Sequence, residues 1–289
     1  MVEGEIVVSI IIPCYNEENV IGRALTHLLD GADAANLEIL VCCNGCHDRT
    51  AEIARAFGPP VHVLETTRGS KTLALNMGDT AATSFPRIYL DADVVLNYAA
   101  VKSIVRALEN KNVLAVAPRM RVDYTNRNWL IRSFYETWLK MPYHLKGMIG
   151  TGIYALSEEG RRRFSSFPEI IADDGFVYAL FAPHERQTLE DCSFTIVPPK
   201  DVSSLVRIKT RSKLGSNELA LTHPELVERQ MSQEDPSCRR IVYRNLLMRP
   251  WLWPKLAVFT TIKFLAAARA REQMKTLKDY QWERDESSR

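Results

Sequence analysis

The sequence predicts an α/β protein with a Rossmann-like, mostly parallel central sheet flanked by helices. Through residues 1–118, short β-rich apolar runs alternate with segments of helical period. Such alternation is typical of parallel strands that are covered on both faces. Polar residues follow several of the predicted strands directly. Because ligands of such sheets bind beyond the carboxyl ends of the strands, the same pattern predicts where a functional site lies.

The predicted strands are 7–12, 37–43, 61–64, 87–90 and 113–117. The first is β-branched and is expected to stop at Pro13, which cannot donate to a strand ladder. The predicted helices between them are 17–29, 49–57, 71–82 and 99–109. Apolar residues recur there at the spacing of one helix face. Beyond residue 118 we expect an aromatic amphipathic stretch at 129–138, a short apolar run after residue 152, helices opening at Asp173 and near Arg207, and a helical C-terminal extension.

Charge is distributed unevenly along the chain. Residues 1–118 carry 9 Lys/Arg against 14 Asp/Glu, residues 119–238 carry 16 against 16, and residues 239–289 carry 12 against 5, so the net charges are −5, 0 and +7. A basic C-terminal tail suits an anionic surface such as a membrane leaflet. No nucleic-acid partner is expected.

Residues 251–268 are predicted to form a helix that does not span a membrane. Their longest uncharged run is 256–262, which Lys255 and Lys263 bound, and a spanning helix needs about 20 apolar residues. Two alternatives remain open. The helix packs on its own domain, or it lies reversibly in the membrane interface with Trp251 and Trp253 among the headgroups.

The cysteines predict no metal centre. Cys43 and Cys46 have CxxC spacing, but no second pair or histidine cluster completes a zinc site. We therefore expect idle reduced thiols.

The N-terminus lacks the cationic start and apolar core of a signal peptide. The expected location is the cytoplasm, with the inner face of the cell membrane as an alternative.

An acidic turn after the fourth predicted strand indicates a cation site. Asp91 and Asp93 are two residues apart, so their carboxylates can project to the same side of the chain. Hard divalent cations take oxygen ligands and often keep positions for diphosphate oxygens. Such a cation neutralises a departing nucleoside diphosphate. Asp93 and Asp91 are thus the predicted ligands of Mn²⁺ or Mg²⁺.

Four segments together resemble the inverting family-2 glycosyltransferases, which have the GT-A fold. They lie in the order and spacing of that family: Ser9–Glu18, Asn44–Thr50, Gly69–Asn76 and Leu90–Asp93. The resemblance implies that Pro13, Tyr15 and Glu17 line the pocket for the nucleotide base and ribose. Asn44 stands where the family usually has an aspartate; its amide both donates and accepts hydrogen bonds and is compatible with a pyrimidine.

The resemblance also assigns the phosphate end of the donor. Lys71, near the start of a helix, would face the donor phosphate or sugar, where the helix N-terminus adds favourable potential. Asp91 would touch the ribose or the metal, and Asp93 would ligate the metal directly. Arg207 and Arg211 come from a basic segment similar to one that closes over the diphosphate in related enzymes. The alternative for this segment is a solvated basic helix.

The second half of the sequence matches the family more loosely. Gly150, Thr151 and Gly152 resemble its acceptor-side turn. Asp173 and Asp174 resemble its acidic pair, so Asp174 would be the catalytic base and Asp173 its support. The alternative for this pair is a solvated helix N-cap.

We accordingly expect three parts. Residues 1–118 would bind the nucleotide sugar, 119–238 would bind the acceptor and supply the base within the same GT-A domain, and 239–289 would form a basic helical extension. The expected reaction moves one sugar from a nucleoside-diphosphate sugar, with a UDP-sugar favoured, to a glycan or lipid-linked acceptor in polysaccharide or glycolipid biosynthesis. The Gln-x-x-Arg-Trp motif of processive synthases is absent from the sequence, which favours single addition. A nucleotidyltransferase and a catalytically silent nucleotide-sugar-binding protein remain as alternatives.

Overall fold

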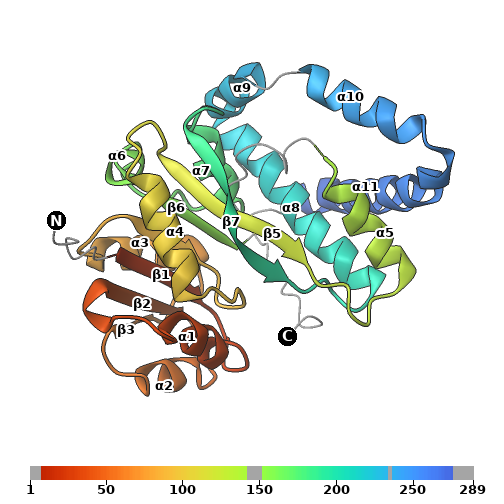
Figure 1. The fold of residues 1–289 in the computed structure, drawn as a ribbon. Helices are drawn as coiled ribbons and strands as arrows, with labels where there is room; N and C mark the ends of the chain where they lie inside the picture. Colours follow the sequence, from red (N-terminus) through yellow and green to blue (C-terminus); the bar gives the residue numbers. More distant parts are fainter. Residues whose placement is uncertain (1–7, 142–151, 234–235, 276–289) are drawn as a thin grey trace. The chain divides into compact units, whose positions relative to one another are not determined.

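The computed structural model describes residues 8–141, 152–233 and 236–275. The chain divides into two compact units. The first comprises Met1–Arg121, Gly147–Glu169 and His184–Thr195, and the second comprises Val122–Lys146, Ile170–Pro183 and Ile196–Arg289. The described part of the first unit contains the β-sheet, whereas that of the second is mainly helical (Figure 1).

The sheet has seven strands in the order β3-β2-β1-β4-β6-β5-β7. Its strands are β1 (Val8–Cys14), β2 (Leu37–Asn44), β3 (Val61–Thr66), β4 (Arg87–Leu90), β5 (Ala115–Val122), β6 (Ile153–Leu156) and β7 (Arg186–Ile196). The pairs β1–β2, β2–β3 and β1–β4 are parallel, while β6 runs antiparallel to both β4 and β5. The predicted α/β class with a mostly parallel sheet is confirmed.

Register brings the ends of the parallel strands to one edge. Cys14 of β1 is paired with Cys43 of β2, and Asn44 of β2 is paired with Thr66 of β3. The first strand does not stop before Pro13, as the sequence suggested, but continues to Cys14. Its register with β4 covers only Ser9 to Ile11, so the missing N–H of Pro13 falls beyond that ladder, where proline is tolerated.

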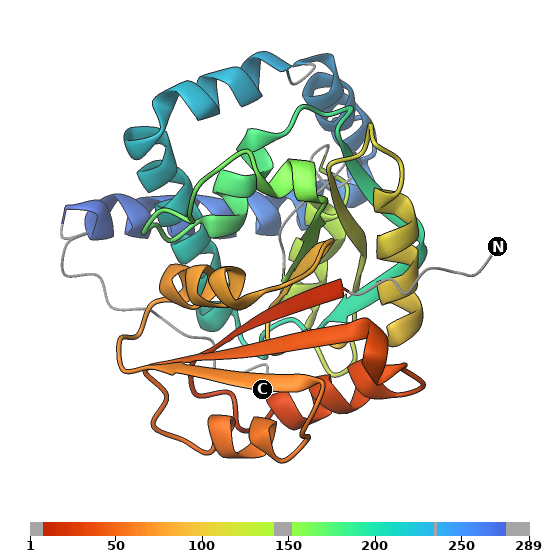
Figure 2. The ribbon, with the colours of Figure 1, turned by 90° about the vertical axis from the view of Figure 1, so that its left-hand side faces the viewer.

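The helices of the first unit are α1 (Ile21–Leu29), η1 (Ala34–Asn36), α2 (Thr50–Arg55), α3 (Lys71–Ala81), α4 (Tyr98–Leu108) and α6 (Glu158–Arg161). Figure 2 shows α3 on one side of β1, β2 and β3, with α1 and α2 on the other. Strands β1 and β2 are almost wholly buried between these layers. Each fully buried isoleucine or leucine there stabilises the fold by about 1.5–3 kcal/mol.

Helix α3 lies unusually close to the sheet because Gly78 has no side chain. A Cβ at Gly78 would come within 2.6 Å of Ile11 Cγ2 and 2.8 Å of Cys42 Sγ. The helix begins at a cap in which Ser70 Oγ accepts the N–H of Leu73 at 3.3 Å. Close packing and the cap together fix where the first residue of this helix, Lys71, lies at the sheet edge.

Two strands depart from the sequence prediction. The fifth runs from Ala115 to Val122 rather than over 113–117, and β7 (Arg186–Ile196) was not predicted at all. The polar end of β5 has no buried residue, and the three buried residues of β7 are never adjacent. The polar end of β5 and the whole of β7 therefore lack the continuous apolar run that marked the parallel strands.

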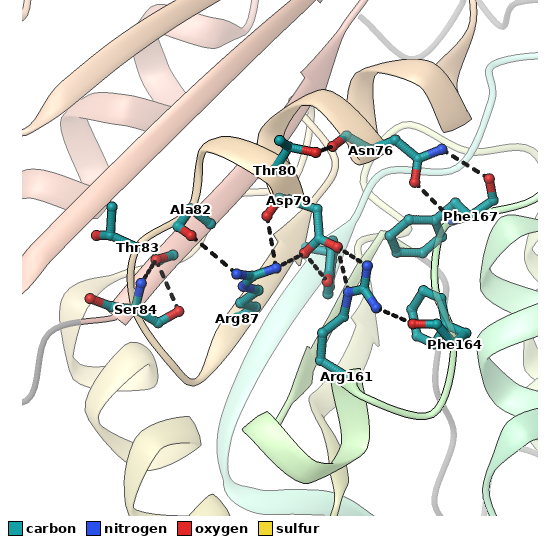
Figure 3. A network of polar contacts seen from close by, with 12 residues as sticks. Asn76, Asp79, Thr80, Ala82, Thr83, Ser84, Arg87, Arg161, Phe164 and Phe167 are labelled. Atoms are coloured by element: carbon teal, nitrogen blue, oxygen red, sulfur yellow. Dashed lines mark hydrogen bonds and ion pairs between the residues drawn. The ribbon is translucent and has the colours of Figure 1, made fainter.

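A buried carboxylate joins α3 to β4 and α6 (Figure 3). Asp79 is 5% exposed and forms ion pairs with Arg87 and Arg161. The hydroxyl of Tyr89 donates to the same carboxylate at 2.8 Å. Arg161 also lies over the ring of Phe164, 4.1 Å from its centroid. Each charge is therefore paired, which is the condition under which a buried carboxylate is tolerated.

The helices of the second unit are α5 (Trp129–Trp138), α7 (Asp173–Leu180), α8 (Val202–Thr222), α9 (Pro224–Gln233), α10 (Pro236–Leu247), η3 (Pro250–Leu252) and α11 (Trp253–Met274). The predicted opening of a helix at Asp173 and the helical extension are confirmed, whereas the helix expected near Arg207 begins earlier, after the Asp201 cap. Helix α11 packs against α8 and α5 (Figure 1). No described helix is long and apolar enough to cross a bilayer.

We predict that Asp79→Asn lowers the free energy of unfolding by about 3–5 kcal/mol, because two buried guanidinium groups lose their counter-charge. Chemical denaturation monitored by circular dichroism measures this. The control is Glu190→Gln, which breaks an ion pair with Arg119 whose side chains are 69% and 60% exposed; it should change stability by less than about 1 kcal/mol. Equal effects of the two variants would contradict the assignment.

Candidate active site

The loops that follow β1 and β2 are held together by short-range polar contacts. Asn16 has a left-handed backbone conformation (φ 54°), which asparagine tolerates better than most residues. Its side-chain oxygen accepts the N–H of His47 at 2.8 Å. The N–H of Glu17 donates to Thr50 Oγ1 at 2.7 Å, and the N–H of Glu18 donates to Asp48 Oδ2 at 3.1 Å. The two loops therefore form one continuous surface at the sheet edge.

Asn44 connects these loops to α3. Its side chain is buried, its Nδ2 donates to the Cys14 carbonyl at 2.7 Å, and its Oδ1 accepts the N–H of Ser70 at 3.0 Å. An aspartate could accept from Ser70 but could not donate to Cys14. These two backbone partners explain why an amide, and not a carboxylate, is present at this position.

Two glycines allow the β2 loop and the loop before α3 to touch. Gly45 has φ +65°, and a Cβ on it would lie 2.9 Å from the backbone N of Gly69. A Cβ on Gly69 would in turn lie 3.6 Å from Cε2 of Tyr15. Tyr15, which is 38% exposed, therefore lies beside the exposed Gly69, whereas Gly45 is buried.

The acidic turn lies beside the start of α3. Lys71 Nζ is 2.9 Å from Asp91 Oδ1, and the N–H of Asp91 donates to the Gly152 carbonyl at 2.8 Å. Gly152 has φ +107°, and a Cβ there would lie 2.6 Å from Val94 Cγ2. Asp93, two residues further on, is exposed. The turn therefore presents one carboxylate paired with an ammonium group and a second one facing solvent.

Asp91 and Asp93 are suited to a hard cation that brings other ligands with it. Among the described residues, no group of three or more His, Cys, Asp or Glu side chains could hold a metal ion. From the described part of the chain, a divalent cation here would have these two carboxylates as ligands, and water or phosphate oxygens would complete its shell, as is common for Mg²⁺ and Mn²⁺ in phosphate sites.

Asp173 and Asp174 belong to the second unit. They occupy the first turn of α7, whose N-cap residue is Ala172 without a side-chain cap. Asp173 is buried, and Asp174 Oδ1 accepts the N–H of Gly175 at 2.7 Å. Neither aspartate is the N-cap that the alternative interpretation required.

The basic segment of α8 divides into residues with different surroundings. Arg207 is exposed and donates to Ser204 Oγ at 2.8 Å, and Arg211 is half-buried. Lys209 between them lies 3.9 Å from the ring centroid of Trp138 and also contacts the rings of Phe134 and Tyr135. Burial lowers the pKa of Lys209 to about 7, and the nearby cations act in the same direction. Lys209 is thus held within the helical unit.

The remaining predicted residues differ in accessibility. Pro13 is buried within β1, and Glu17 is 8% exposed. Gly150 and Thr151 lie outside the described residues. The sequence did not single out Asn16 or Thr50, which position the loop carrying Tyr15. Asn16 offered one signal, because asparagine after a strand often adopts a left-handed turn.

Comparison with known proteins gives the class. Residues 9–159 match the family described as glycosyl transferase family 2, so the chain belongs to that family. A relative, 4,4'-diaponeurosporenoate glycosyltransferase of Staphylococcus aureus (strain USA300), is 28% identical over 167 residues, which cover 55% of this chain and 41% of the relative. The match therefore spans less than half of that protein.

Solved structures support the fold. A mannosyltransferase from Pyrobaculum calidifontis, in complex with GDP-Man and Mn²⁺, superposes with a TM-score of 0.60 at 21% identity, over 95% of this chain and 81% of that one. Glucosyl-3-phosphoglycerate synthase from Mycobacterium tuberculosis, with Mn²⁺, UDP and glucosyl-3-phosphoglycerate, gives 0.54 at 18% identity, over 80% and 81%. The fold is the GT-A fold, as expected from the sequence.

The close approach at Gly45 leads to a prediction that separates the destabilising effect of a steric clash from that of backbone strain. Gly45→Ala should destabilise the protein by about 1–3 kcal/mol more than Gly58→Ala, because only the former places a methyl group against a neighbouring backbone. Gly58 is the matched control, since it has φ +64° and an added Cβ would meet nothing within 4 Å. Equal losses in thermal or chemical unfolding would show that the two loops do not touch.

Proposed function

We propose that this family-2 glycosyltransferase moves one sugar from a nucleoside-diphosphate sugar, with UDP-sugars favoured, to an acceptor hydroxyl with inversion. The observation that carries the proposal is the contact of Lys71 with Asp91 beside the exposed Asp93. An ammonium group, a helix N-terminus and two carboxylates at one sheet edge suit a diphosphate together with a divalent cation.

The donor would lie along the surface formed by the loops after β1 and β2. The exposed Tyr15 side chain, which lies beside Gly69, would stack on the base. Pro13 and Glu17 would line the pocket for the nucleotide base and ribose. Because the Asn44 side chain already bonds two backbone groups, it would contribute mainly by holding these loops in place. Lys71 would contact the donor phosphate or sugar.

Mn²⁺ or Mg²⁺ would be held by Asp93, with Asp91 as a further ligand or ribose contact. The ion would neutralise charge on the departing nucleoside diphosphate. The solved mannosyltransferase in complex with GDP-Man and Mn²⁺, and the glucosyl-3-phosphoglycerate synthase in complex with Mn²⁺ and UDP, support this choice of cofactor. Arg207 and Arg211 would add positive charge for the diphosphate.

Asp174 would remove the proton of the acceptor hydroxyl as its oxygen attacks the anomeric carbon opposite the leaving group. Asp173, buried at the start of the same helix, would support it. A single displacement of this kind inverts the anomeric centre. Gly152, together with Gly150 and Thr151, would form the acceptor side.

The acceptor would be a glycan or a lipid-linked molecule, and the pathway would be polysaccharide or glycolipid biosynthesis. The relative from Staphylococcus aureus is a 4,4'-diaponeurosporenoate glycosyltransferase. At the end of α10 and in η3, four large apolar side chains are exposed: Leu247 (57%), Met248 (75%), Trp251 (70%) and Trp253 (54%). Trp253 Nε1 donates to the Leu247 carbonyl at 3.0 Å, so these residues form one corner.

Charge around this corner suits an anionic bilayer. Residues 236–275 include nine Lys/Arg and a single carboxylate, Glu272. Lys255 is paired with Glu136, but other cations, such as Arg249, are exposed. The opposite face of α11 packs inside the unit through Phe259 and Ile262. We therefore propose that one face of α11 packs within its unit while the corner contacts the inner face of the cell membrane. This combines the two alternatives, internal packing and membrane contact.

Donor binding is tested by thermal shift. UDP-sugars should raise the melting temperature of the wild-type protein, and more so with Mn²⁺ or Mg²⁺ than with EDTA. Asp93→Asn should remove the metal-dependent part of the shift. Glu109→Gln, an exposed carboxylate at the end of α4, is the control and should keep it. The absence of stabilisation by any nucleoside diphosphate would refute the proposal.

The base is tested by kinetics. Asp174→Asn should lower kcat by about 10²–10⁴-fold, because an amide cannot take the acceptor proton. UDP affinity should stay within about threefold, since Asp174 does not bind the donor. Glu225→Gln, an exposed carboxylate in the first turn of α9, is the control in the same unit. Unchanged sugar transfer by Asp174→Asn would show that another group is the base.

Membrane contact is tested by vesicle sedimentation. Wild-type protein should bind phosphatidylcholine vesicles containing phosphatidylglycerol, and binding should weaken in high salt. Replacing Met248 and Trp251 together by glutamine should reduce binding about tenfold or more, as buried apolar area is lost. Leu221 and Met231, 72% and 62% exposed, provide the matched double-glutamine control. Equal binding by both double variants would rule out the corner as the contact.

A further inference from the structure

Three cysteines gather where β1 and β2 end. Cys14 and Cys43 are the paired residues of the two strands and are buried, whereas Cys46 is half-buried in the loop after β2. Cys46 Sγ lies 3.4 Å from the carbonyl oxygen of Cys14, which is the register partner of Cys43. The CxxC spacing of the sequence therefore brings Cys43 and Cys46 to the same pair of strand ends.

We propose that Cys46 is an oxidation-sensitive modification site, at which a hydroperoxide first oxidises Cys46 and Cys43 then closes a disulfide with it. The site differs from a structural thiol in two respects: its sulfur is partly accessible, and a second thiol lies within reach to resolve the first product.

The surroundings of Cys46 favour its thiolate. The hydrogen bond from Cys43 lowers the pKa of Cys46 to about 7, and the backbone N–H of Asn16 acts in the same direction, while burial and the Asp48 carboxylate oppose them. Cys14, Cys42, Cys43 and Cys192 have raised pKa values, and burial raises that of Cys192 to about 11. Cys192 is also half-buried, so exposure alone does not distinguish the two.

The chemistry balances with the peroxide as oxidant. The Cys46 thiolate attacks one peroxide oxygen, the O–O bond breaks, and hydroxide leaves as Cys46 becomes a sulfenic acid. The sulfur of Cys43 then attacks the Cys46 sulfur and displaces its oxygen, which leaves as water with the Cys43 proton. Both sulfurs are oxidised by one electron each, and one hydrogen peroxide is reduced to two waters.

The disulfide would act on the loop that carries Tyr15. Cys46 Sγ accepts the N–H of Asn16 at 3.4 Å and as a thiol donates to the Cys14 carbonyl at 3.4 Å. A disulfide with Cys43 removes the thiol proton that Cys46 donates to the Cys14 carbonyl. This consequence rests on the proposed function, in which that loop binds the nucleotide. Loss of this contact should weaken UDP binding about tenfold.

The first experiment needs no nucleotide. The reduced full chain is treated with hydrogen peroxide, and intact mass followed by fragmentation of the peptide locates the bond. We expect the loss of two hydrogens between Cys43 and Cys46, reversed by dithiothreitol. Cys46→Ser should block this product and Cys192→Ser should not. In the wild-type protein at pH 7, iodoacetamide should label Cys46 at least about tenfold faster than Cys192.

A disulfide that excludes Cys46, no disulfide at all, or equal labelling of the two cysteines would overturn the assignment. The second experiment compares UDP affinity before and after oxidation by calorimetry. A reversible loss of about tenfold supports the coupling, and equal affinity of the two forms overturns it. If the reduced protein binds no nucleoside diphosphate, the proposed function fails, while the mass measurement still decides the assignment of Cys46.

Discussion

The geometry of the sheet edge depends on the side-chain amide of Asn44. Its donor and acceptor join two backbone groups, the carbonyl at the end of β1 and the N–H of Ser70 at the cap of α3. Both partners are buried or nearly so, and an unpaired polar group there would cost about 1–3 kcal/mol. Satisfying them requires that the two strands end in register and that α3 begins beside them. The position of Lys71 follows from that requirement, since it is the first residue of α3.

Further along α3, close packing on the sheet and buried polar contacts hold the helix in place. Gly78 lets α3 lie directly on β1 and β2, and the Asp79 carboxylate connects it to β4 and α6. Asn76, in the segment that resembled a family motif, exchanges two hydrogen bonds with the backbone of Phe167. Within the segment that resembles a family motif, Lys71 therefore lies at the sheet edge beside Asp91, whereas Asn76 holds α3 in place, as Asp79 does.

Much of the first unit could be predicted because its parallel strands are continuous apolar runs, and polar residues after such runs must meet at one edge. The place of the Asp91–Asp93 turn followed from that rule, whereas Lys71 was named only through the family resemblance, and its contact with Asp91 is a finding of the structure. Strand β7 could not be predicted, because its buried residues are isolated and form neither a continuous apolar run nor a strict alternation. The two backbone partners of Asn44 and the contact of Cys46 with the end of β1 could not be predicted either. They depend on side-chain distances across strands, which composition and spacing do not contain. The roles of Asp173, Asp174, Arg207 and Arg211 remain predictions of the resemblance.

The most direct measurement is anomalous diffraction from a crystal of the full chain soaked with UDP and Mn²⁺. A manganese peak beside the Asp93 carboxylate, with the diphosphate between it and Lys71 and the uracil against Tyr15, is the predicted result. Nucleotide and metal bound elsewhere on the protein, with the Asp91–Asp93 turn unchanged, would contradict the proposed donor site.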